Sequence, residues 1–289
     1  MKIEQVIRAS VIGSKALEML QRTGRGQMTG QTSGGVFLRT DADRILFLSF
    51  VSWRGPLTIN LSTADRENLI FDLHSPFLIR DGAILFQEEA IAIYFDRATL
   101  WSPPPRPKSL DSPEERAQRF SRVKEPITAA LERRFHPDQE VDPISASPSG
   151  IELASLDALR IAVKSRQPAG IATALVAGLG NGPGLTPAGD DLVLGFLLAL
   201  NRWGNRLCPD LPPEPINRAL VEAARQRTTA LSASLIECAA NGLADERLVL
   251  ALDGLVSGNL TEDRIVDHFQ DWGHTSGAAA LAGMELVLE

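Results

Sequence analysis

A proline-rich stretch at residues 101–108 constrains the fold of this chain most strongly. It reads W-S-P-P-P-R-P-K. Proline fixes φ and has no backbone N–H, so the stretch is expected to continue neither a strand ladder nor a helix. The residue patterns on its two sides differ. We therefore predict a β-rich domain at residues 1–100, a linker at 101–112 and a helical domain at 113–289.

Short apolar runs before residue 100 predict β-strands. They are rich in Val, Ile, Leu and Phe and are separated by turn residues. The runs are Val36–Arg39, Ile45–Val51, Leu57–Leu61, Leu69–Leu73, Ala83–Phe86 and Ile91–Phe95. The segment Thr23–Gly35 is dense in Gly, Thr, Ser and Gln without periodicity, which predicts a loop. Regular spacing of short strands favours an antiparallel β barrel or sandwich.

The pattern changes to helical after the linker. Ser112 and Glu115 have the spacing of a capping box and open a helix towards Phe135. Pro126 is expected to kink or split this helix, because proline removes a helical hydrogen bond. A second loop, rich in Pro and Ser, is predicted at His136–Gly150.

Helical periodicity continues from Ile151 to the end of the chain. Breaks are predicted at Pro168–Gly170, Gly180–Asp191 and Gly204–Pro215, one helix at Ala219–Asn241 and a last helix at Ala278–Leu288. Small residues within Ala219–Asn241 permit close helix packing. The expected fold is therefore α+β, with a β domain followed by an α-helical bundle.

The composition limits the classes to which the protein can belong. Hydrophobic residues make up 44% and charged residues 22%, as in globular domains. The first residues lack the apolar region of a secretory signal, and the longest apolar run, Leu192–Leu200, is too short to span a bilayer. We therefore expect a cytoplasmic protein with no membrane contact. The net charge of −7, without a basic stripe, argues against nucleic acid as a partner.

The central motif, Gly180–Asp191, reads G-N-G-P-G-L-T-P-A-G-D-D and leads into the apolar run Leu192–Leu200. Thr186 is predicted as the helix N-cap, and Pro187 suits the first helical turn. Glycines 180, 182 and 184 permit positive φ, so successive N–H groups can converge at the positive end of the helix dipole. The motif is a candidate anion site, and a well-capped turn without function is an equal alternative.

Two adjacent carboxylates, Asp190 and Asp191, follow this loop. Neighbouring residues face different directions on a helix. We therefore expect one carboxylate to face the loop, where it accepts a hydrogen bond or holds a metal, and the other to bond neighbouring backbone. The motif lacks the Lys of a phosphate-binding Walker loop, and its spacing does not fit the dinucleotide fingerprint.

Other hydroxyl-bearing segments are candidates for the same site. Gly273–Gly277 breaks the pattern before the last helix, so two capped helix starts either face each other across one polar pocket or are unrelated, the second being favoured from spacing alone. Thr228, Thr229, Ser232 and Ser234 lie in the predicted helix at Ala219–Asn241. These four are interpreted first as packing positions, with lining of the same pocket as the alternative.

Three motifs together resemble a known family. They are G-x-G-L-T-P-A-G-D-D-L-x-x-G at Gly182–Gly195, T-x-x-S-A-x-x-L at Thr229–Ile236 and H-T-S-G at His274–Gly277. The second motif matches loosely, because Ile236 stands at the position of its Leu, one place beyond Leu235. The chain resembles a bacterial family long catalogued as a domain of unknown function, with some members labelled carboxylases. The family includes the AllH subunit of oxamate carbamoyltransferase.

The resemblance implies a subunit of an enzyme that transfers a carbamoyl group from carbamoyl phosphate to oxamate and yields oxalurate, in purine catabolism. On this basis we predict Asp190, Asp191 and Thr186 as catalytic residues. The predicted substrate-binding residues are Gly182, Gly184, Leu185, Gly189, His274, Thr275, Ser276 and Gly277. A cation is missing from the motif, so Arg22, Arg25, Arg54 or another subunit is expected to supply one.

The expected partners are a small anionic substrate and other protein subunits or further copies of the chain. No cofactor is predicted. One alternative is a hydrolase or lyase in which Asp190 and Asp191 bind Mg²⁺, because paired carboxylates suit a hard cation. Another is a subunit that binds a metabolite without converting it.

Overall fold

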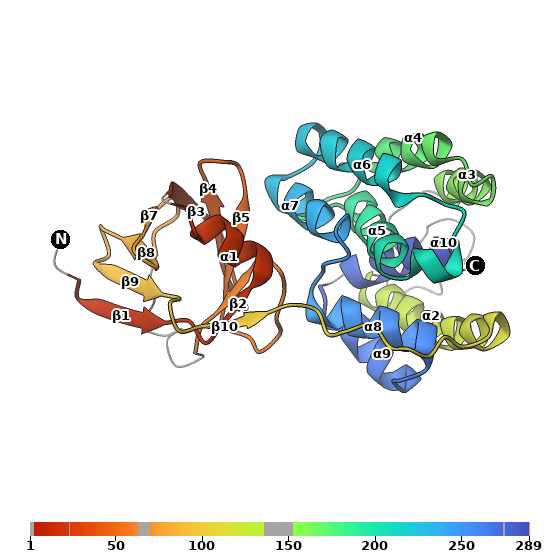
Figure 1. The fold of residues 1–289 in the computed structure, drawn as a ribbon, viewed down its shortest axis with the longest axis horizontal. Helices are drawn as coiled ribbons and strands as arrows, with labels where there is room; N and C mark the ends of the chain where they lie inside the picture. Colours follow the sequence, from red (N-terminus) through yellow and green to blue (C-terminus); the bar gives the residue numbers. More distant parts are fainter. Residues whose placement is uncertain are drawn as a thin grey trace. The chain divides into compact units, whose positions relative to one another are not determined.

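The computed structural model describes residues 3–22, 24–62, 69, 71–135, 153–273 and 275–288. The chain divides into two compact units, Met1–Pro103 and Pro104–Glu289 (Figure 1). The first unit is built on a β-sheet and the second on α-helices, so the predicted α+β class is confirmed. None of the helices in the described ranges is long and apolar enough to cross a membrane.

The first unit contains one ten-stranded sheet with the strand order β1-β9-β8-β7-β3-β4-β5-β6-β2-β10. Its elements are β1 (Gln5–Arg8), β2 (Val11–Gly13), α1 (Ser14–Leu20), β3 (Gly24–Thr32), β4 (Gly35–Thr40), β5 (Ile45–Ser49), β6 (Thr58–Asn60), β7 (Pro76–Arg80), β8 (Ala83–Phe86), β9 (Ile91–Tyr94) and β10 (Thr99–Trp101). Large apolar side chains from β4, β5, β7 and β8 fill one continuous core.

The first unit is the predicted β-rich domain, but its sheet is mixed and not antiparallel throughout. Strand β1 pairs parallel with β9, β5 pairs parallel with β6, and β2 pairs parallel with β10. Two of these pairs join the start of the chain to residues more than 80 positions later. Local residue patterns carry no signal for such long-range pairing.

Strand β3 replaces the loop predicted at Thr23–Gly35. It hydrogen-bonds to β4 on one side and β7 on the other, although Met28 is its one buried side chain. A Cβ at Gly26 would overlap the carbonyl oxygen of Arg39 and the ring of Phe77. Glycine here allows a neighbouring strand to approach closely. The strand therefore has the glycine-rich composition that predicts a loop.

Two further boundaries differ from the prediction. In the run Leu69–Leu73, Leu69 and Phe71 are buried but lie outside any strand, while Ile70 falls outside the described residues. Trp101 was assigned to the linker, yet it is a buried residue that ends β10. Strands β1, β2, β7 and β10 and helix α1 were not predicted, because each is short or carries few periodic apolar residues.

The second unit is an α-helical bundle, as predicted. Its helices are α2 (Pro113–Phe135), α3 (Leu153–Lys164), α4 (Pro168–Gly178), α5 (Ala188–Leu207), α6 (Pro213–Arg227), α7 (Ala230–Ala239), α8 (Glu246–Ser257), α9 (Glu262–Gln270) and α10 (Ser276–Leu288). Every residue from Ala188 to Leu200 is buried, as expected of a helix enclosed on all sides. Figure 1 shows α5 and α10 in the middle of this unit.

Glycines bring α5 and α10 into backbone contact. A Cβ at Gly195 would overlap the carbonyl oxygen of Ala280, and a Cβ at Gly283 would overlap that of Leu192. Both helices are thereby fixed against each other along their buried faces. This packing also fixes the positions of their N-termini, where the candidate site lies.

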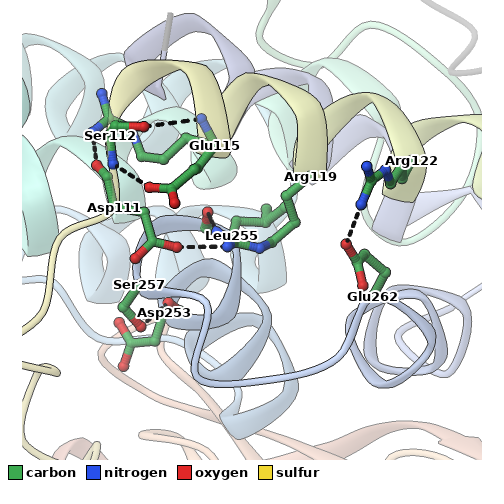
Figure 2. A network of polar contacts seen from close by, with 10 residues as sticks. Asp111, Ser112, Glu115, Arg119, Arg122, Asp253, Leu255, Ser257 and Glu262 are labelled. Atoms are coloured by element: carbon green, nitrogen blue, oxygen red, sulfur yellow. Dashed lines mark hydrogen bonds and ion pairs between the residues drawn. The ribbon is translucent and has the colours of Figure 1, made fainter.

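The start of α2 forms the predicted capping box, which Figure 2 shows from close by. The Ser112 N–H donates to Glu115 Oε2 at 2.9 Å, and the Glu115 N–H donates to Ser112 Oγ at 3.2 Å. The helix runs through Pro126 and is not split there, which leaves a kink as the remaining part of the prediction. The loop predicted at His136–Gly150 lies outside the described residues.

Three helix boundaries were misplaced. Pro168–Gly170 is the first turn of α4 and not a break, and Gly204 lies within α5. The single helix predicted at Ala219–Asn241 is two helices, α6 and α7, which separate at Thr228 and Thr229. Thr229 caps α7 by accepting a hydrogen bond from the Ser232 N–H at 3.1 Å. Ala224, Arg225, Gln226 and Arg227 before this junction and Ala230 and Leu231 after it conceal the break, because these residue types favour helix.

Candidate functional site

The central motif has the backbone conformation that its glycines predict. Gly180, Gly182 and Gly184 have φ values of +77°, +115° and +102°. A Cβ at Gly180 would overlap the carbonyl oxygen of Arg227, and one at Gly182 would lie 2.9 Å from the Ala188 amide nitrogen. The first two glycines are therefore required by both conformation and space.

Three helix N-termini meet at this motif. Helix α5 begins within it, at Ala188. Thr229, the N-cap of α7, donates its hydroxyl to the Leu185 carbonyl oxygen at 2.8 Å. Ser276, the first residue of α10, has its Oγ 3.2 Å from Thr186 Oγ1. Because each helix N-terminus carries partial positive charge, their convergence favours a bound anion.

Asp190 holds the motif in shape. Its side chain is buried, with 2% exposed. Oδ1 accepts a hydrogen bond from the Gly180 N–H at 2.8 Å, and Oδ2 accepts one from the Thr228 hydroxyl. One carboxylate thus ties the start of the motif to the break between α6 and α7. Asp190 is therefore the carboxylate of the pair that accepts a hydrogen bond from the loop.

Asp191 is placed differently. It is 1% exposed, and its Oδ2 has no hydrogen-bond partner among the described residues. Burial raises the pKa of Asp191 to about 7, the hydroxyls of Ser276 and Thr186 oppose this rise, and the charge of Asp190 adds to it. A carboxyl group with this pKa exchanges its proton near neutral pH, which suits acid–base catalysis.

Backbone donors lie in the same motif. In the described part of the chain, nothing accepts a hydrogen bond from the N–H groups of Gly182, Gly184, Leu185 and Thr186. A Cβ at Gly184 would meet open space, and the Leu185 side chain is 61% exposed. The motif therefore combines accessible donors with a buried carboxylate, an arrangement able to bind an anion and take a proton.

The predicted cap of α5 is wrong in detail. Pro187 occupies the N-cap position with φ −53° and ψ 146°, and no side chain caps the helix. Thr186 lies one residue outside, and its hydroxyl meets Ser276 instead. The two predicted helix starts therefore face each other, which was the less favoured interpretation of their spacing.

The remaining predicted site residues divide by position. Gly189 and Gly277 are packing glycines, because a Cβ would overlap the carbonyl oxygens of Gly178 and Phe269 respectively. The last helix begins two residues before the predicted start, and the Thr275 carbonyl oxygen accepts from the Ala279 N–H at 3.1 Å. His274 lies outside the described residues. The roles of all four in substrate binding stay predictions.

Two hydroxyls interpreted as packing positions belong to the site. Thr228 and Thr229 bond Asp190 and Leu185, whereas Ser234 donates to the Ala230 carbonyl oxygen of its own helix at 2.7 Å. Ser232 Oγ is buried without a partner in the described residues. The adjacent threonines were the available signal, since Thr favours helix N-caps over helix interiors.

Sequence reasoning also missed Arg227. Its carbonyl oxygen faces Gly180, and its guanidinium donates to the Val176 carbonyl oxygen at 3.1 Å. Its guanidinium lies at the C-terminal turn of α4, the helix that precedes the central motif. The candidate cations Arg22, Arg25 and Arg54 belong to the first unit, and their role stays a prediction. The described ranges contain no group of three or more His, Cys, Asp or Glu side chains placed to hold a metal ion.

Comparison with known proteins identifies a similar family. Residues 178–288 match the model of a family described as oxamate carbamoyltransferase subunit AllH. The match includes the central motif and the N-termini of α5, α7 and α10. No curated protein and no solved structure matches the chain. The resemblance inferred from the three motifs is confirmed over residues 178–288, the part of the chain that carries all three and that is similar to the AllH family.

Proposed function

We propose that this chain is a subunit of a carbamoyltransferase-type enzyme that converts carbamoyl phosphate and oxamate to oxalurate and phosphate. The proposal rests on the family match and on one structural observation. Asp191 is a buried carboxyl group with an unpartnered oxygen and a pKa of about 7, and it lies where three helix N-termini converge. The enzyme is expected to contain further subunits, since the family description is that of a subunit.

The helix N-termini account for substrate binding. Carbamoyl phosphate is an anion, and the N–H groups from Gly182 to Thr186 provide donors without other partners in the described chain. The hydroxyls of Thr186 and Ser276 add donors beside them. These groups stabilise the negative charge that develops on the carbonyl and phosphate oxygens during transfer. A cation from Arg227 or from a partner subunit completes the charge balance.

Asp191 accounts for the movement of the proton. The amide nitrogen of oxamate attacks the carbonyl carbon of carbamoyl phosphate, and a C–N bond forms as the C–O bond to phosphate breaks. Phosphate leaves with the bonding electron pair. The attacking nitrogen loses one proton, which the ionised Asp191 carboxylate accepts and later releases to phosphate or water. A pKa near neutrality lets Asp191 perform both steps.

The arrangement of the two carboxylates favours this role over Mg²⁺ binding. Both oxygens of Asp190 are already engaged, by the Gly180 N–H and the Thr228 hydroxyl. A magnesium ion at the motif would therefore find one carboxylate, Asp191, rather than a pair. Magnesium dependence remains a measurable alternative and forms one arm of the test.

Calorimetric titration tests substrate binding directly. The purified chain is titrated with carbamoyl phosphate, phosphate and oxamate, each with and without Mg²⁺, and so is the Gly184→Val variant. Valine at φ +102° disturbs the motif, whereas the control Gly170→Val changes an α4 glycine with space around it. We expect metal-independent binding of carbamoyl phosphate that Gly184→Val loses and Gly170→Val keeps. Binding that requires Mg²⁺, or that Gly184→Val retains, would overturn this assignment.

A further inference from the structure

A cavity of about 210 Å³ lies in the second unit, apart from the central motif. Its lining comes from α3, from the segment before α4, from the C-terminal ends of α5 and α10, and from the residues after α5. The lining residues are Arg160, Val163, Lys164, Arg166, Leu207, Cys208, Leu211, Leu286 and Val287. Helix α5 has 20 residues and so spans about 30 Å. The cavity and the central motif therefore lie at opposite ends of α5.

The charges that line the cavity are all positive. Arg160, Lys164 and Arg166 contribute, and no carboxylate is among the described lining residues. Arg166 pairs with exposed Asp210 at 3.1 Å, and Arg160 reaches Glu285 at 3.4 Å, a carboxylate that Lys124 also holds at 2.8 Å.

Within the described chain, Lys164 has no ion pair. Positive charge therefore remains uncompensated at this cavity, although the chain as a whole has a net charge of −7. Such a local excess of positive charge favours an anionic ligand.

The other part of the lining is apolar. Leu211, Leu286 and Val287 are 5%, 5% and 7% exposed, and Val163 and Leu207 extend this surface. An inorganic anion would leave these side chains without contacts. The combination of an apolar wall and cations fits a ligand with an apolar body and one charged end.

We propose that this cavity binds a small amphipathic carboxylate, with its apolar body against the leucine and valine side chains and its carboxylate beside Lys164 and Arg166. The cavity is smaller than the roughly 300–1,000 Å³ of drug-sized sites, so a short alkyl chain or a single ring fills it. This site is independent of the carbamoyl-transfer proposal, because none of its lining residues belongs to the central motif.

Cys208 provides a reporter for occupancy. Its thiol lines the cavity and is partly exposed, whereas Cys238, the second cysteine of the chain, is buried. Burial raises the pKa of Cys208 and nearby Arg166 lowers it. A bound carboxylate would cover the thiol and add negative charge, and both effects slow its alkylation. Labelling of Cys238 reports unfolding in the same sample.

The test measures the rate of maleimide labelling at Cys208 by mass spectrometry, with hexanoate, hexan-1-ol or inorganic phosphate as the probe. We expect hexanoate to slow labelling saturably, about tenfold at ten times its Kd, with unchanged labelling of Cys238. Hexan-1-ol and phosphate should each need at least a tenfold higher concentration than hexanoate to give the same protection of Cys208. Equal protection by hexan-1-ol would show a purely apolar cavity and overturn the proposal. Equal protection by phosphate would show non-specific anion binding and would overturn it too.

Matched charge variants locate the carboxylate. Lys164→Gln is expected to weaken hexanoate binding about tenfold, the effect of losing one charge-assisted contact. Arg218→Gln removes the same charge from an exposed position on α6 and should leave binding unchanged. The absence of saturable protection by hexanoate, or equal affinities of Lys164→Gln and the unaltered chain, would contradict the proposed site.

Discussion

At the residue scale, the proposed function depends on one carboxyl group, that of Asp191, in an unusual environment. Asp190 and Asp191 are adjacent and equally buried, yet Asp190 has two hydrogen-bond donors and Asp191 keeps an unpartnered oxygen. Burial without full compensation raises the pKa of Asp191. A buried group of this kind reduces stability when it ionises.

This environment predicts a pH-dependent stability. The folded-state pKa of about 7 lies above the ordinary value of 3.8 for an Asp side chain, so the folded chain binds more protons than the unfolded chain between these values. Its stability therefore falls as pH rises from about 4 to 7. Relative to Asp191→Asn, the unaltered chain should lose about 3 kcal/mol between pH 5 and pH 8. Urea unfolding at the two pH values measures the difference.

An exposed carboxylate supplies the control for this prediction. Asp81 lies in a turn with φ +53°, which asparagine also adopts. The Asp81→Asn variant should follow the unaltered chain at both pH values. If the stability of Asp191→Asn changes between the two pH values as much as that of the unaltered chain, the pKa of Asp191 is not raised.

At the element scale, the site depends on the contact between α5 and α10. Gly195 and Gly283 let the two helix backbones meet, and the same packing brings Thr186 to Ser276. Small residues at a helix crossing set how closely the axes approach. A larger side chain at either glycine is therefore expected to separate the helix N-termini as well as to cost stability.

Substitution of these glycines tests the contact. At Gly283 an added methyl group overlaps the backbone carbonyl of Leu192, so Gly283→Ala should destabilise the chain by about 1–3 kcal/mol. At Gly178, in α4, a Cβ meets nothing within 4 Å, and Gly178→Ala should stabilise by about 0.5–1 kcal/mol. Thermal or urea unfolding gives both values. The two substitutions should change the free energy of unfolding in opposite directions. If Gly283→Ala leaves this free energy unchanged, the backbones of α5 and α10 do not approach as closely as described.

The same elements show what the sequence can reveal. Ser112 and Glu115 form a capping box from a local pattern, and the positive φ values of the central motif follow from its glycines. The strand β3 and the α6–α7 break were missed, because their causes are a neighbouring backbone at Gly26 and a hydroxyl contact at Thr229. Such causes lie in tertiary contacts, which residue periodicity does not encode.

The candidate site was predictable to a similar extent. The motif itself indicated an anion site and a division of roles between two carboxylates. It did not show which carboxylate was engaged, since the donor to Asp190 is Thr228, 38 positions later. Nor did spacing show that the starts of α5 and α10 meet.

At the scale of the whole molecule, the proline-rich stretch belongs partly to each unit. Trp101 ends a strand of the first unit, whereas Pro104 begins the second. Arg202 forms a buried, two-fold ion pair with Asp253 at 2.6 and 2.7 Å and also donates to the Pro104 carbonyl oxygen at 2.9 Å. Asp111 likewise pairs with Arg119 at 2.5 Å (Figure 2).

These contacts predict where the second unit can be separated. A fragment of residues 104–289 keeps the Pro104 carbonyl oxygen that Arg202 contacts and the Asp111 carboxylate that pairs with Arg119. A fragment of residues 113–289 loses both contacts and leaves buried charge less compensated. We expect the longer fragment to be more stable by at least about 2 kcal/mol, because buried groups that lose partners are costly. Urea unfolding followed by circular dichroism compares the two. Equal stability would show that residues 104–112 act only as a tether.

If Asp191 takes the proton during carbamoyl transfer, the rate of transfer must follow the ionisation of Asp191, which a pH–rate profile measures. The profile is kcat/KM for transfer from carbamoyl phosphate to oxamate by the assembled enzyme, measured with the unaltered chain, Asp191→Asn and Asp81→Asn. With the unaltered chain, kcat/KM should rise about tenfold per pH unit as the pH increases towards 7 and should level off near pH 7. The Asp81→Asn enzyme should have the same profile. The kcat/KM of the Asp191→Asn enzyme should be about 10²–10⁴-fold lower and should not increase with pH. An Asp191→Asn enzyme with the full rate and the same profile would contradict the account.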